Sequence, residues 1–89
     1  TSFYVSYQAL YSSPALACSS TPIGYVQKWH NGNSTLPVLG NTIFNFSSGT
    51  SVFVTGQSWV KISQFDSIPP YGNISTTSEG IVDDANGCP

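Results

Sequence analysis

The sequence predicts an all-β fold: a small single-domain antiparallel β-sandwich, Ig-like or of Greek-key or meander type, with about six to eight short strands and one disulfide. Short runs of β-branched and aromatic residues alternate with Gly, Ser, Asn and Pro. Heptads, internal repeats and helix-period apolar stripes are missing from the sequence. The 89 residues suit one domain, 1–89, and include two cysteines that can pair.

The first predicted strand spans residues 1–11 and contains no Gly or Pro. Its apolar face holds Phe3, Val5, Tyr7 and Ala9 at alternate positions. A loop at residues 12–22 follows. The strand is therefore free either to be the first strand of its own sandwich or to be donated to a neighbouring subunit. The sequence leaves both alternatives open.

A second strand is predicted at residues 23–29, followed by an Asn-Gly hairpin turn at residues 30–33. Residues 34–39 would return as a short strand. Pro37 has no amide donor, which places this strand at a sheet edge.

Residues 41–63 form the densest run of strand-forming residues and predict a three-stranded meander. Its core face is predicted to hold Phe44, Phe46, Val52, Val54, Val60 and Ile62. This assignment of faces follows if Asn45 carries a glycan and therefore faces solvent. Because side chains alternate along a strand, Phe44 and Phe46 then face the core and Ile43 faces outward.

Beyond residue 63 the strand pattern weakens. Residues 64–73 predict an extended segment that ends in a turn, and residues 74–82 a weak strand. Residues 83–89 are polar and predict a C-terminal tail.

Charge is scarce, with two Lys, no Arg and four acidic residues. Two cations cannot neutralise several phosphates, so nucleic-acid binding is not expected. No apolar run approaches the ~20 residues of a membrane helix, so membrane insertion is not expected either. The first residue is Thr1 rather than Met, which suggests a processed, secreted product.

Cys18 and Cys88 predict a disulfide, because neither belongs to a CxxC pair and a metal site would need more ligands. Three sequons, at Asn33, Asn45 and Asn73, point to the same extracellular or cell-surface location. We expect all three asparagines at the surface and at least one of them glycosylated. The alternative is that they are ordinary turn residues.

Candidate catalytic and metal-binding residues are weak. His30 is the single histidine, lies in the predicted turn and has no nucleophile elbow to serve, so an exposed turn residue is the simpler interpretation. Glu79, Asp83, Asp84 and Asn86 carry oxygen ligands but lack EF-hand spacing. We therefore expect no enzyme activity, no catalytic residue, no metal and no cofactor.

Aromatic residues make up 13% of the chain. Phe53 and Trp59 alternate with apolar neighbours, so both faces of the predicted sheet carry apolar side chains. We assign Phe53 and Trp59, together with Phe3, Val5, Tyr7 and Ala9, to a candidate interaction surface for a partner or a sugar. Ordinary core packing is the alternative.

In composition the chain is similar to subunits of extracellular surface filaments and to small secreted effector, inhibitor or toxin domains. The preferred function is therefore a non-enzymatic structural or adhesive glycoprotein of an extracellular assembly, whose partners are copies of itself and which polymerises by exchange of the N-terminal strand. The alternative is a monomeric secreted binding module, lectin-like modules included, with its site at residues 30–34 or 68–73.

Overall fold

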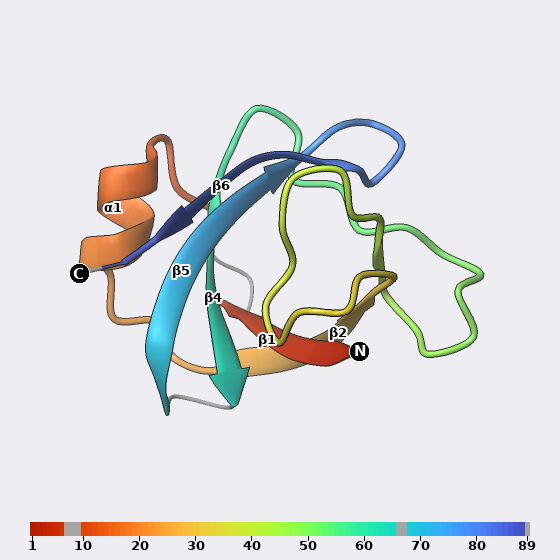
Figure 1. Ribbon diagram of the computed structural model, residues 1–89. Helices are drawn as coiled ribbons and strands as arrows, with labels where there is room; N and C mark the ends of the chain where they lie inside the picture. The colour runs from red at the N-terminus through yellow and green to blue at the C-terminus, as the bar shows by residue number, and fades with distance from the viewer. Residues whose placement is uncertain (7–9, 66–67, 89) are drawn as a thin grey trace.

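A computed structural model describes residues 1–6, 10–65 and 68–88 (Figure 1). Within these residues there are six strands and one short helix. In chain order they are β1 (Ser2–Ser6), α1 (Pro14–Ser19), β2 (Tyr25–His30), β3 (Ile43–Phe44), β4 (Val60–Phe65), β5 (Ile68–Thr76) and β6 (Val82–Gly87). The predicted all-β class is confirmed, apart from the helix.

The described strands form one antiparallel sheet in the order β3-β2-β1-β4-β5-β6. The sheet curls until its two ends meet: the Val82 amide donates to the Asn41 carbonyl at 2.8 Å, and the Ile43 amide donates to the Gly80 carbonyl at 2.9 Å. The prediction of a sandwich is therefore wrong in its architecture. β1 connects both halves of a single half-barrel, so there are no two separate sheets to stack.

The concave face of the sheet holds the core. Its buried side chains are Phe3, Val5, Ile43, Val60, Ile62, Ile74 and Val82, with Val26, Leu36, Phe53 and Ala85 packed against them. Alternate residues of β1 and β4 contribute to it, as the period of a strand requires, and β5 adds Ile74. The predicted inward positions of Phe3, Val5, Val60 and Ile62 are confirmed.

The predicted meander at residues 41–63 is wrong in its first two strands. β3 has two residues, and only an isolated bridge joins Phe44 to Val52. The phase is also reversed: Ile43 is fully buried, whereas Phe46 is 58% exposed. The Ile43 main chain explains this, because its amide pairs with Gly80 and its carbonyl accepts from the Phe53 amide.

β1 lies in the middle of the sheet and pairs with β2 on one side and β4 on the other. Donation to a neighbour would break both ladders and remove Phe3 and Val5 from the core. Tyr7 and Ala9 lie outside the described residues.

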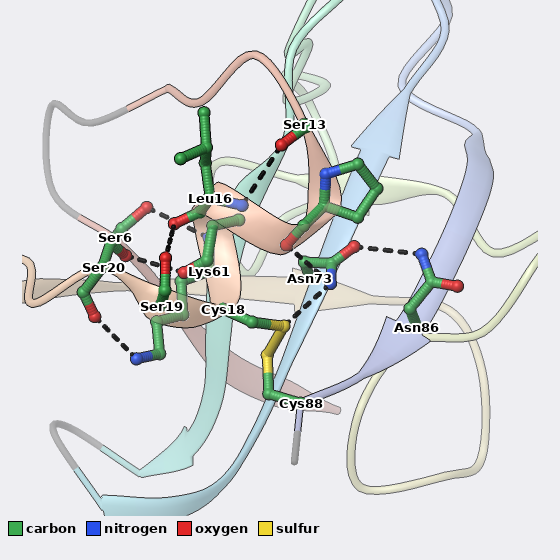
Figure 2. Close-up of a disulfide and its surroundings, with 12 residues drawn as sticks. Ser6, Ser13, Leu16, Cys18, Ser19, Ser20, Lys61, Asn73, Asn86 and Cys88 are labelled. Carbon is green, nitrogen blue, oxygen red and sulfur yellow. Dashed lines mark hydrogen bonds between the residues drawn. A yellow bond between two sulfur atoms is a disulfide. The ribbon is translucent and has the colours of Figure 1, made fainter.

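Residues 12–22, predicted as a loop, contain α1. Ser13 is its N-cap, accepting from the Leu16 amide at 3.2 Å, and Pro14 occupies the first turn, where its missing donor has no cost. The helix lies against β4 and β5 (Figures 1 and 2). The predicted disulfide between Cys18 and Cys88 is confirmed and joins α1 to the residue after β6.

Three further predictions differ from the structure. β5 runs through the end of the predicted segment 64–73 and the start of the predicted strand 74–82, and a turn at residues 77–80 interrupts the latter. Residues 34–39 form no strand, and Pro37 is buried rather than at a sheet edge. Residues 82–87, which include positions 83–87 of the predicted polar tail, form β6, because their main chain pairs with β5 although their side chains are mostly polar.

Candidate functional site

A groove lies between the loop at residues 34–38 and the strands β4, β5 and β6, with a volume of about 460 Å³. In Figure 1 this loop is drawn in yellow and β6 in dark blue. The lining residues are Ser34, Thr35, Leu36, Pro37, Val38, Ile62, Gln64, Gly72, Asn73, Ala85, Asn86 and Gly87. The size falls within the range of protein ligand pockets.

The groove is hollow because two glycines face each other across β5 and β6. Gly72 pairs directly with Gly87, so neither strand places a side chain on the concave face there. A Cβ added at Gly72 would lie 2.8 Å from the Asn86 carbonyl oxygen and 3.3 Å from the Ile62 side chain, whereas one added at Gly87 would meet nothing within 4 Å. Gly87 therefore borders the open part of the groove.

One rim of the groove is the free edge of β6. The Cys88 amide donates to the Tyr71 carbonyl at 2.9 Å, which makes 71 and 88 a hydrogen-bonded pair of the β5–β6 ladder. Since such pairs alternate in an antiparallel ladder, the main-chain groups of Ala85 and Gly87 point away from β5. β6 is the last strand of the sheet, and no described residue pairs with this part of its edge.

The same edge is closed at its other end. The Val82 main chain also points outward and is occupied, because its amide donates to Asn41 and its carbonyl accepts from the Gly40 amide at 3.0 Å. The half-barrel is therefore sealed beside Val82 and open beside Ala85 and Gly87.

No side chain that lines the groove is charged. The nearby acids of β6 are occupied: Asp83 accepts from the Ser75 hydroxyl at 2.6 Å, and Asp84 accepts from Trp59 Nε1 at 2.8 Å. The groove thus offers main-chain hydrogen-bonding groups, a few neutral polar side chains and apolar walls. It contains no nucleophile paired with a base.

A second hollow of about 470 Å³ lies beside the disulfide, lined by Pro14, Ala15, Cys18, Ser19, Asn73, Asn86 and Gly87. The Asn73 amide links α1 and β6 beside this hollow (Figure 2). Its Nδ2 lies 3.1 Å from Cys18 Sγ and 3.4 Å from the Pro14 carbonyl oxygen, and its Oδ1 accepts from Asn86 Nδ2. These bonds hold α1 against the sheet.

Of the six residues predicted as an interaction surface, Tyr7 and Ala9 lie outside the described residues, and the other four are at least half-buried. Phe3 and Val5 belong to the core. Phe53 packs partly against the core, with Lys28 Nζ 5.3 Å from its ring centroid, and burial lowers the pKa of that lysine. Trp59 is half-buried and tied to Asp84.

His30 is buried, with 3% of its surface exposed, which corrects the expectation of an exposed turn histidine. Its ring packs edge-on against Phe3, Nδ1 accepts from the Gly32 amide at 3.1 Å, and Nε2 lies 3.4 Å from the Thr35 carbonyl. Burial lowers the pKa of His30 below 6.5, opposed by the bonds to the backbone of Thr35 and Ser34 and assisted by the charge of the N-terminus. The neutral His30 ring therefore holds residues 30–35 in place through its contacts with the Gly32 amide and the Thr35 carbonyl.

The three sequons differ in exposure. Asn33 is exposed, as predicted. Asn45 is half-buried, and its Nδ2 donates to Ser51 Oγ and the Val52 carbonyl, both at 2.9 Å. Asn73 is 1% exposed, which corrects its predicted surface position. Its strand position places the amide under α1, where a glycan has no room.

In the part of the chain that the structure describes, no three His, Cys, Asp or Glu side chains come together as a metal site. No helix among those residues has the length and apolar character needed to cross a bilayer. The disulfide is of the kind that oxidising, extracellular-type environments maintain.

Comparisons with protein-family models, with curated proteins and with solved structures find no match to this chain. The groove is therefore described by its geometry alone. The segments 30–34 and 68–73, predicted as alternative binding sites, contribute Ser34, Gly72 and Asn73 to its lining. The groove as a whole is not predictable from the sequence, because Gly72 and Gly87 become neighbours only through the β5–β6 register.

Proposed function

We propose that this chain is a non-enzymatic extracellular domain that works by protein contact, as a structural or adhesive subunit of an extracellular assembly. The observation that carries the proposal is the open edge of β6 at Ala85 and Gly87 beside an uncharged groove. Unpaired strand edges are sites where another chain adds, and folded proteins normally cover or charge them.

The compartment in this proposal is supported by the disulfide and by the exposed Asn33 sequon. A polar surface with few charges that carries glycan would stay soluble with only two lysines and no arginine. Secretion and glycosylation at Asn33 are part of the proposal.

The contact in this proposal involves β6 rather than the N-terminal strand. Residues 1–11 remain the alternative donor, but β1 is held by two ladders, and Phe3 and Val5 would leave the core with it. The same central position of β1 favours the second candidate function, a monomeric secreted binding module that uses the groove for a different protein.

Size-exclusion chromatography with light scattering on the native glycosylated protein tests the choice. The assembly proposal predicts a mass that rises with concentration to several times that of the subunit. A constant subunit mass up to millimolar concentration would refute self-assembly and leave the monomeric binding module.

A further inference from the structure

We propose that the groove beside β6 binds an uncharged, extended peptide segment of a partner protein, which adds as a strand to the edge at Ala85 and Gly87. This inference rests on the proposed function in its general form, contact with protein. It names the acceptor site and the chemistry of what enters it.

The edge supplies main-chain hydrogen bonds. Ala85 and Gly87 each present one N–H and one C=O on the side away from β5. An antiparallel or parallel strand can pair with these groups, and main-chain pairing of this kind is a recurrent mode of peptide recognition.

The opposite wall cannot close the groove by pairing with β6 itself. Pro37 has no amide donor, and the Val38 amide is already bound to Asn41 Oδ1 at 2.9 Å. The Thr35 carbonyl faces His30 Nε2. The loop therefore stands beside the edge as a wall, and the space between them remains available to another chain.

The groove also selects by charge and size. Its walls include Leu36, Pro37, Val38 and Ile62, and no lining residue could neutralise a buried charge. A lysine or glutamate side chain entering it would lose hydration without gaining a partner. Because Gly87 leaves the floor bare on the β6 side, a small or branched apolar side chain can enter at alternate positions of the added strand.

The probe is the peptide acetyl-Thr-Ser-Val-Phe-Val-Thr-amide, which copies the uncharged residues 50–55 of this chain. We expect it to shift the amide resonances of Ala85 and Gly87 in ¹⁵N-labelled full-length protein. The same peptide with alternate amides N-methylated should bind at least about fivefold more weakly, since each lost main-chain bond contributes about a factor of five. A peptide with both valines replaced by lysine should also bind more weakly.

Gly87→Val tests the groove without disturbing the fold, because an added Cβ there meets nothing within 4 Å and the φ is not positive. We expect about a tenfold loss of peptide binding through occlusion of the groove. Gly24→Val is the matched control: its Cβ also meets nothing, and Gly24 does not line the groove. It should bind like the parent protein.

A second matched pair uses charge. Val38→Asp places a carboxylate on the wall, whereas Leu39→Asp places one on the neighbouring exposed residue outside the groove. We expect the first to weaken binding and the second to leave it unchanged.

Absence of shifts at Ala85 and Gly87, or shifts that Gly87→Val leaves intact, would overturn the proposal. Shifts produced by a neutral oligosaccharide such as cellohexaose but not by the peptide would also overturn it and make the groove a sugar site. The titration measures binding of the peptide to one subunit and does not require subunits to bind one another. Its outcome is therefore independent of the light-scattering result. A monomeric protein that binds the peptide refutes self-assembly alone.

Discussion

Replacing both cysteines by alanine should remove a large part of the stability of this domain. The disulfide joins residues 70 positions apart. In the chain-entropy model a closed loop of that length stabilises the folded state by about 4.4 kcal/mol through the unfolded chain. A domain of 89 residues is expected to have an unfolding free energy of about 4–13 kcal/mol. The loss is therefore comparable to the lower part of that range.

A smaller local loss accompanies it. Asn73 Nδ2 loses Cys18 Sγ as an acceptor at 3.1 Å and keeps the longer contact of 3.4 Å to the Pro14 carbonyl. We expect this to contribute about 1 kcal/mol. α1 should loosen first, because the disulfide and the Asn73 amide are two of the links that hold it to the sheet.

Urea unfolding of the parent protein, the reduced parent protein and the Cys18→Ala/Cys88→Ala variant measures these terms. The reduced parent is the matched control, because it loses the crosslink and keeps both side-chain sulfurs. We expect the reduced parent to lose about 4 kcal/mol and the alanine variant about 1 kcal/mol more. Both should unfold with a steeper urea dependence, since an uncrosslinked unfolded chain exposes more surface. A loss below about 1 kcal/mol in both would refute the chain-entropy reasoning. A loss confined to the alanine variant would assign the stability to local packing.

Three further predictions concern single positions. Gly80→Ala should lower the unfolding free energy more than Gly40→Ala: both have positive φ, but only the Cβ at Gly80 would come within 2.6 Å of a neighbouring carbon, and equal losses would exclude that contact as the cause. The pKa of His30 is lower in the folded protein than its ordinary value of 6.5 in the unfolded chain. Its contribution to stability is therefore complete above pH 6.5. It is lost as the pH falls from 6.5 toward the folded pKa, because the unfolded chain takes up the proton first. Unfolding free energies between about pH 8 and 5 should show this decline, and a decline that persists unchanged in His30→Gln would contradict the assignment. Glycopeptide mass spectrometry of protein secreted from eukaryotic cells should find glycan on Asn33 and none on Asn73, whereas folded protein modified at Asn73 would contradict its burial.

The sequence by itself determined the β class, the disulfide and the inward face of β1 and β4. Phe3 and Val5, like Val60 and Ile62, lie two residues apart in breaker-free runs, and local alternation is sufficient to group them. Cys18 and Cys88 had only each other as partners.

The tertiary structure decided the phase of the central stretch, the curl of the sheet and the groove. Alternation groups the residues of a strand into two faces, but where both faces carry apolar residues, as at residues 43–46, it does not say which face is buried. Ile43 is buried because its main chain is hydrogen-bonded to the distant Gly80. The register of β6 against β5 shifts at a β-bulge between Ser75 and Thr76. Asn73 became buried because α1 covers its strand, and Gly87 borders an open groove because its register partner is another glycine. These outcomes depend on pairings between distant parts of the chain, which a local pattern does not contain.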